Sequence, residues 1–210
     1  MKILILVLSY DDRGVFTTFM KTQMETWDND EHDDIDVVYY HGGNEDRWRG
    51  WGELELNCSD DYDMMHWKFK LALDAIDYHT YDFIFRTNSC SYIVKERLLK
   101  VAETLPKTKC YAGWNCGTWI SGAGIFFTPD VLDILVNELI PEPYGAEDVM
   151  YGRMLAGRIE MIDDKSRIDA DVEGFHSFDG YHFRAKTSND INDRWRDIES
   201  LKRLHKELTK

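Results

Sequence analysis

Two adjacent carboxylates are the residues of this sequence best suited to move a proton. Glu147 and Asp148 follow Tyr144-Gly145-Ala146, where a helical pattern begins. A carboxylate at the mouth of a crevice can accept a proton from a hydroxyl, or hold that hydroxyl in line for attack. Carboxylates are also stabilised by the dipole at a helix N-terminus, which is a sufficient structural reason for the same pair. Both interpretations stay open.

A late basic segment is suited to bind phosphate. His182, Arg184 and Lys186 alternate, so an extended chain would project all three side chains from one face. Such a trio suits a pyrophosphate and its metal, with His182 as an imidazole ligand and Lys186 as a point charge on a phosphate. An ordinary surface His–Lys pair would look the same.

The charge balance of the whole chain limits the partners of that segment. Its 210 residues hold 25 Lys and Arg against 39 Asp and Glu, a net charge of −14. This sign disfavours nucleic acid and anionic membranes as partners. A small phosphorylated ligand needs only a local cluster of cations or a divalent metal.

Short polar side chains follow the apolar run Phe83-Ile84-Phe85. They are Arg86, Thr87, Asn88 and Ser89. In an open parallel sheet the ligand crevice lies at the carboxyl ends of the strands, where such groups reach a ligand. A capped turn that satisfies its own backbone is the alternative.

Ser9, Tyr10, Asp11 and Arg13 follow the first apolar run, residues 3–8. This turn lacks the GxGxxG pattern, which argues against a dinucleotide-binding site. Tyr10 could stack on a base while Asp11 accepts from its ring N–H or from a ribose hydroxyl, and a plain Asx-rich turn is the alternative. Farther along, Gly122 and its neighbours interrupt an aromatic-rich strand, which permits close approach of a ligand or marks a bulge.

Elements that alternate between strand and helix periodicity must position these groups. The pattern predicts one α/β domain with a largely parallel sheet covered by helices on both faces. The expected strands are residues 2–9, 36–40, 81–86, 119–127 and 159–162, with 81–86 central because it is apolar on both faces. The expected helices lie within residues 16–27, 63–76, 129–139, 147–156 and 190–208.

Several other classes of protein are disfavoured. The first apolar run is too short for a signal-peptide core or a membrane span. The cysteines show no CxxC pair, so a cytoplasmic chain with reduced thiols is expected. The acidic run over residues 28–36 is interpreted as a solvated helix end and loop. The last helix has no stop signal before Lys210, which is compatible with the first domain of a longer product.

The order of these segments resembles the GT-A glycosyltransferases over nearly the whole chain. Within that family, size and motifs are most similar to the small domains that large chloroviruses encode to glycosylate their capsid protein. The segments that carry the resemblance are Ser9-Tyr10-Asp11, residues 81–89, residues 119–124, residues 145–149 and residues 182–186.

The resemblance implies a GT-A fold and a nucleotide-sugar donor, usually UDP-linked, with Mn²⁺ or Mg²⁺ bridging its phosphates. Residues 1–100 would bind the nucleotide, residues 101–190 would bind a glycan or glycoprotein acceptor, and a C-terminal helix would follow over 190–210. In an inverting enzyme Asp148 or Glu147 would deprotonate the acceptor, and in a retaining one it would orient the sugar or hydroxyl. The implied donor-site residues are Ser9, Tyr10, Asp11, Arg13, Lys68, Arg86, Thr87, Asn88, Arg184 and Lys186, and the implied sugar and acceptor residues are Trp119, Gly122 and Ala123.

One departure from the family pattern concerns the metal. Where such enzymes usually carry Asp-x-Asp, this chain has Thr87-Asn88-Ser89. Neutral amide and hydroxyl oxygens bind a hard cation more weakly than carboxylates. The expected ligands are therefore Asn88 and Ser89 with His182 supplementing them, and metal is expected only when donor is present.

Two other functions are kept as alternatives. A non-catalytic carbohydrate-binding protein on a decayed transferase fold would explain the missing acidic motif and the seven tryptophans, which stack well on sugar faces. A sugar nucleotidyltransferase would need a phosphate loop rich in glycine and lysine after the first strand, and residues 11–14 match that poorly.

Overall fold

The first strand, β1 (Ile3–Leu8), divides one apolar run between two cores. The structure is a computed structural model that describes residues 1–10, 14–29 and 31–210. Every side chain of β1 is buried, and alternate residues belong to different hydrophobic clusters. Since side chains alternate across a strand, this is the pattern of a strand covered on both faces.

The described residues form an eight-stranded sheet in the order β3-β4-β2-β1-β5-β8-β7-β9. β1 pairs in parallel with β2 and β5, and β2 pairs in parallel with β4. The central position expected for residues 81–86 is confirmed by β5. The other strands of this sheet are β2 (Ile35–Gly43), β3 (Arg47–Arg49), β4 (Glu53–Asn57), β5 (Phe83–Asn88), β7 (Tyr111–Asn115), β8 (Ile120–Phe127) and β9 (Met161–Asp163).

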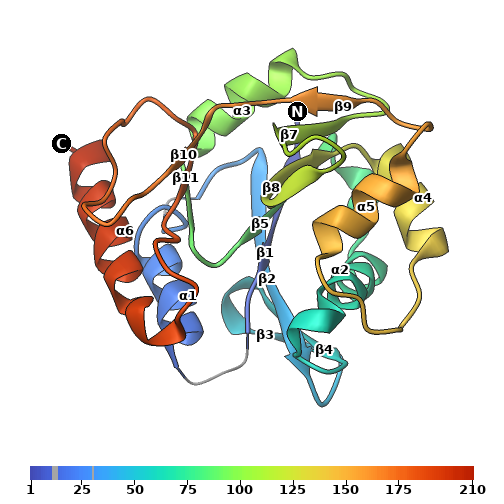
Figure 1. The fold of residues 1–210 in the computed structure, drawn as a ribbon, viewed down its shortest axis with the longest axis horizontal. Helices are drawn as coiled ribbons and strands as arrows, with labels where there is room; N and C mark the ends of the chain where they lie inside the picture. Colours follow the sequence, from blue (N-terminus) through green and yellow to red (C-terminus); the bar gives the residue numbers. More distant parts are fainter. Residues whose placement is uncertain (11–13, 30) are drawn as a thin grey trace.

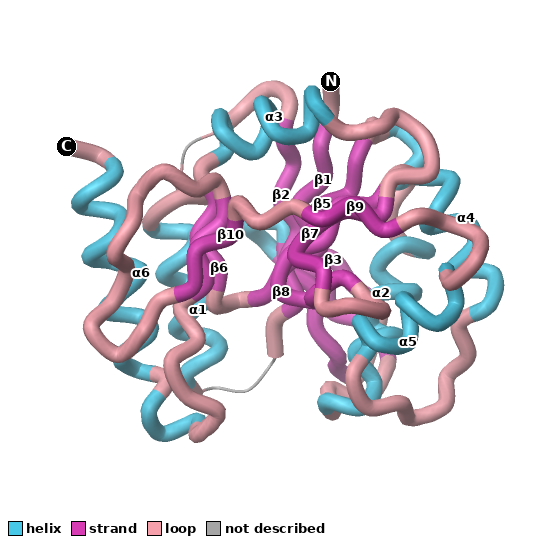
Figure 2. Tube along the Cα trace, turned by 45° about the horizontal axis from the view of Figure 1, so that its top comes forward, coloured by secondary structure: helices cyan, strands magenta, loops and turns pink. Residues whose placement is uncertain are grey.

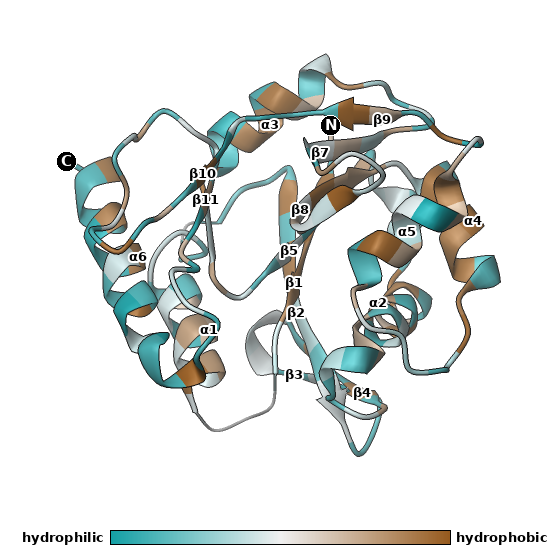
Figure 3. Ribbon diagram, in the orientation of Figure 1, coloured by the Kyte–Doolittle hydropathy of each residue, from teal (hydrophilic) through white to brown (hydrophobic). Residues whose placement is uncertain are grey.

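Helices cover both faces of the sheet, as expected. Figures 1 and 2 show α1 and α6 on one side of the strands and α2, α4 and α5 on the other. α3 contributes to the same core cluster as α1 and α6. Figure 3 colours the central strands as hydrophobic and much of α6 as hydrophilic. The helices are α1 (Val15–Glu25), α2 (Met65–Asp74), α3 (Lys95–Thr104), α4 (Pro129–Glu138), α5 (Glu147–Leu155) and α6 (Trp195–Leu208).

The direction of β8 differs from a purely parallel sheet and matters for the site. β8 runs antiparallel to β5, with Thr87 opposite Gly124. The first residues of β8 therefore lie beside the carboxyl end of β5. This reversal places Gly122 and Ala123 at the edge where a parallel sheet collects its ligand-binding groups.

A second, three-stranded sheet has the order β10-β11-β6. The extended segment expected near residue 182 is confirmed as β11 (His182–Arg184), which lies between β10 (Arg167–Asp169) and β6 (Ser91–Ile93). Arg184 is paired with Ser91, and the Ala185 N–H donates to the Cys90 carbonyl at 2.9 Å. Backbone hydrogen bonds therefore hold the late basic segment beside the turn that follows β5.

Two further differences from the expected elements are local. The segment 190–208 is not one helix: the 3₁₀ turn η4 (Ile191–Asp193) precedes α6, and the Asp190 carboxylate caps it by accepting from the Asn192 N–H at 2.9 Å. Some elements were not predicted from the sequence: the helix α3 and the short strands β3, β4, β6, β7 and β10. Within the described part of the chain, no helix is both long and apolar enough to cross a membrane.

Candidate active site

A cavity of about 410 Å³ opens where β1 and β5 end. It brings together five of the residues expected to bind a donor or its metal: Tyr10, Asn88, Ser89, Arg184 and Lys186. The early turn, the end of β5 and the late basic segment therefore meet at one place. The rest of its described lining is Leu8, Phe16, Tyr62, Met65, Cys90, Asn189 and Arg194.

The charge of this lining is opposite to that of the protein as a whole. The described lining contains Arg184, Lys186 and Arg194, and none of it is Asp or Glu. The charge of Arg194 is neutralised by an ion pair with Asp197, which does not line the cavity. Arg184 and Lys186 form no ion pair with any described residue, and the Arg184 Nε is buried without a hydrogen-bond partner. Burial, with the nearby Arg184 charge, lowers the pKa of Lys186. An anionic ligand would supply the missing negative charge.

Arg86 connects the cavity wall to the candidate carboxylates. Its side chain is 1 % exposed and forms an ion pair with Glu147, which is 2 % exposed. One terminal nitrogen donates to the Gly122 carbonyl and, at 2.8 Å, to the Asn88 Oδ1. Arg86 therefore lies beneath the site, where it ties β5, β8 and the start of α5 together.

Asp148 is held differently from Glu147. The Gly122 N–H donates to Asp148 Oδ2 at 2.8 Å, and the Val149 N–H donates to Oδ1 at 2.9 Å. A Cβ at Gly122 would lie 3.2 Å from Asp148 Oδ2 and 3.4 Å from Arg86 Nη1, so the missing side chain permits this close approach. Asp148 is half-buried and forms no ion pair with the described residues.

The residues expected to ligate a metal are arranged in ways that do not fit that role. The Asn88 amide oxygen already accepts from Arg86. His182 is 1 % exposed, and its Nε2 shares a 2.9 Å hydrogen bond with the Ser91 hydroxyl. Burial and the charges of two neighbouring arginines hold the pKa of His182 well below its usual range. No three His, Cys, Asp or Glu side chains of the described residues gather as a metal ion requires. Mn²⁺ or Mg²⁺ therefore stays a prediction from the sequence.

Three other donor-site candidates are enclosed by the protein. Lys68 is fully buried, donates to Asp60 Oδ1 at 2.8 Å and lies over the Tyr10 ring at 4.2 Å. It supports Tyr10 rather than lining the cavity. The Thr87 hydroxyl donates to the Ala123 carbonyl at 2.7 Å, and Ser9 is fully buried.

Trp119 packs against α5, since a Cβ at Gly152 would meet the Trp119 Cβ at 2.6 Å. Asp11 and Arg13 lie outside the described residues.

Some members of the site had no sequence signal. Arg194 and Asn189 come from the segment before α6, whose sequence predicts only the start of a helix. Tyr62 comes from a 3₁₀ turn before α2. A second cavity of about 700 Å³ shares Tyr10, Phe16 and Tyr62 with the first and continues to the ends of β2 and β4. The crevice therefore extends along the carboxyl ends of the parallel strands.

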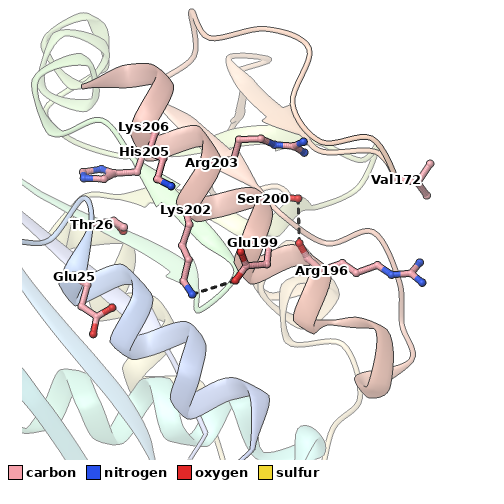
Figure 4. A pocket seen from close by; sticks show the side chains of 10 residues that line it. All are labelled: Glu25, Thr26, Val172, Arg196, Glu199, Ser200, Lys202, Arg203, His205 and Lys206. Atoms are coloured by element: carbon pink, nitrogen blue, oxygen red, sulfur yellow. Dashed lines mark hydrogen bonds and ion pairs between the residues drawn. The ribbon is translucent and has the colours of Figure 1, made fainter. Parts of the chain in front are cut away.

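A cavity of about 710 Å³ lies elsewhere, between the end of α1 and α6 (Figure 4). Its lining is mixed in charge, because Glu25 and Glu199 accompany its basic residues and Lys202 pairs with Glu199 at 3.1 Å. It contains none of the expected site residues.

Comparison with known proteins defines the fold further. No protein-family model and no curated protein sequence matches the chain. A crystal structure of a glycosyltransferase involved in the glycosylation of the major capsid of PBCV-1 matches with a TM-score of 0.58 and 13 % sequence identity, covering 96 % of this chain and 100 % of that chain. The chain has the fold of that glycosyltransferase. The fold implied by the order of the motifs is thereby confirmed.

A second solved structure, the apo form of the glycosyltransferase GlyE from Streptococcus pneumoniae TIGR4, has a TM-score of 0.44 and 11 % identity. That match covers 80 % of this chain and 46 % of the GlyE chain.

Proposed function

We propose that the chain is a glycosyltransferase that moves a sugar from a UDP-linked donor to a hydroxyl of a glycan or glycoprotein. The observation that carries this proposal is the cavity at the ends of β1 and β5, where Arg184 and Lys186 form no ion pair with the described residues and the described lining holds no acid. A glycosyltransferase fold with an anion-binding cavity at the carboxyl edge of its sheet is best suited to a diphosphate leaving group.

The donor is expected to lie along the crevice. Tyr10 and Phe16 pack with ring centroids 4.9 Å apart and supply an aromatic wall for the base. Arg184 and Lys186, which line the same cavity, then receive the diphosphate. The sugar extends toward Gly122 and Asp148, which Arg86 links to the cavity through Asn88.

In the reaction, the bond between the anomeric carbon and the diphosphate oxygen breaks, and its electron pair leaves with the nucleoside diphosphate. A new bond forms between the anomeric carbon and the acceptor oxygen. Glu147 is committed to Arg86, so Asp148 is the carboxylate available to the acceptor. In an inverting enzyme Asp148 takes the hydroxyl proton, and in a retaining one it orients the hydroxyl.

The acceptor is proposed by analogy. The structurally similar PBCV-1 enzyme takes part in capsid glycosylation. A capsid glycan is therefore the acceptor that we propose to test first, with Trp119, Gly122 and Ala123 on its side of the site.

A ligand panel followed by a turnover assay tests the proposed function. UDP at about 100 times its Kd should raise the melting temperature by roughly 5–10 °C, more than GDP or CMP. UDP-sugar should then be hydrolysed or transferred above background. Sugar binding without turnover would instead support the carbohydrate-binding alternative, and pyrophosphate release from UTP plus sugar phosphate would support the nucleotidyltransferase.

Lys186→Ala should weaken UDP binding by about 10- to 100-fold, because a charge-assisted hydrogen bond to phosphate is lost. Uridine, which has no phosphate, should lose less than about twofold. Calorimetric titration of both ligands checks this, with Lys202→Ala as the control because Lys202 pairs with Glu199 on α6. Equal losses for UDP and uridine would remove Lys186 from the phosphate site.

UDP affinity should also fall as the pH rises toward the lowered pKa of Lys186. The free ammonium loses its proton at a lower pH than an ordinary lysine, and the neutral amine no longer attracts phosphate. Lys186→Arg stays charged and should remove this part of the pH dependence. Titrating both proteins over the same alkaline range checks the sign, and parallel curves would contradict it.

A further inference from the structure

The orientation of one amide determines how this site can neutralise a diphosphate. Asn88 stands where the family pattern would place a metal-binding acid. We propose that the site binds the donor diphosphate without a divalent cation, using the Asn88 amide N–H groups together with Arg184 and Lys186. This inference rests on the proposed function and concerns the same cavity.

Only one end of the Asn88 amide is free to meet a ligand. Arg86 Nη1 lies 2.8 Å from Asn88 Oδ1. A guanidinium has donors and no acceptor, so the amide atom that faces it must be the oxygen. The Asn88 side chain lines the cavity, and its NH₂ group has no hydrogen-bond partner among the described residues. The group left for a ligand is therefore a donor, which suits a phosphate oxygen and cannot ligate a metal.

Arg86 holds the Asn88 amide in this orientation. Its guanidinium is 1 % exposed and is fixed by the Gly122 carbonyl and the Glu147 carboxylate. Turning the Asn88 oxygen toward a metal would point the NH₂ group at the buried guanidinium, donor against donor, and would remove an acceptor from Arg86 Nη1.

The charges around the cavity disfavour a divalent cation. A divalent cation would enter a described lining that contains Arg184, Lys186 and Arg194 and no carboxylate. Ser89 offers only a neutral hydroxyl there, and His182 is enclosed and bonded to Ser91. The described carboxylates of the crevice, Asp60 and Asp61, line the adjoining cavity instead. The cations of this lining attract two adjacent phosphates, so side chains can take the role that a metal has in other phosphate sites.

The experiment is a calorimetric titration of UDP into the wild-type chain and into Asn88→Asp, each with EDTA and with Mn²⁺. For the wild type we expect a Kd that changes by less than about twofold between EDTA and Mn²⁺. Asn88→Asp replaces a donor with a negative charge beside the diphosphate and should weaken UDP by about tenfold or more in both conditions. Asn189→Asp, which places the same charge on another lining residue of the cavity, shows how much of the loss is general repulsion.

Three other outcomes would contradict the inference or the proposed function. Wild-type binding that requires Mn²⁺ would overturn the inference and leave the proposed function standing. So would binding by Asn88→Asp in EDTA that equals the wild type, because the amide N–H groups would then contribute nothing to diphosphate binding. Absence of UDP binding by the wild type in both conditions would instead overturn the proposed function, and with it the inference.

Discussion

Asp148→Asn should lower sugar transfer by about 100-fold or more while the Kd for UDP stays within about twofold of the wild type. The asparagine oxygen can still accept from the Gly122 N–H, as Asp148 Oδ2 does at 2.8 Å, and this bond should hold the side chain in place. The hydrogen bond from the Val149 N–H is lost, because the amide NH₂ group cannot accept it. What is lost is the negative charge that accepts or orients the acceptor proton. Initial rates with saturating donor, measured beside UDP titrations, separate these two effects.

The matched control is Asp130→Asn. Asp130 also lies in the first turn of a helix, α4, and its carboxylate accepts from the Lys109 N–H at 2.8 Å, outside the site. That variant should retain full turnover. If Asp148→Asn also turned over normally, Asp148 would have no role at the reacting centre.

Arg86→Met should have the largest effect on stability. It would leave the Glu147 carboxylate buried without its counter-ion, and breaking a buried pair in this way costs about 3–5 kcal/mol. For a chain of this size the melting temperature should fall by roughly 10 °C. Equilibrium unfolding in urea, with the melting temperature as a second measure, checks this.

A double variant distinguishes the ion pair from packing. Arg86→Met with Glu147→Leu removes both charges, and such replacements are often neutral or stabilising. The double variant should therefore recover much of the stability lost in Arg86→Met. If the double variant lost as much as the two single variants combined, the pair would be contributing nothing as a pair.

The fold was largely predictable because its central elements carry strong local patterns. β1 and β5 are continuous apolar runs, and Thr128-Pro129 marks the start of α4. The direction of β8 was not predictable, since it depends on pairing with β5 rather than on the composition of β8 itself. Strands of three residues, such as β6, are too short to show a period and form only because β11 pairs with them.

The proximity of several candidate residues was predictable from the sequence, while their contacts were not. Sequence order placed Tyr10, Asn88 and Lys186 at one edge, and the cavity contains all three. The sequence could not show that Arg86 would be buried against Glu147, because the two are brought together only by tertiary packing. It also could not show that the Asn88 amide oxygen would accept from Arg86, the contact on which the proposed phosphate-binding role of the NH₂ group depends.

A crystal structure of the chain soaked with a UDP-sugar tests the central claim most directly. We expect diphosphate density against Arg184 and Lys186 in the cavity at the ends of β1 and β5, with the sugar directed toward Asp148. An empty cavity at saturating ligand, or a nucleotide bound in another part of the molecule, would contradict it.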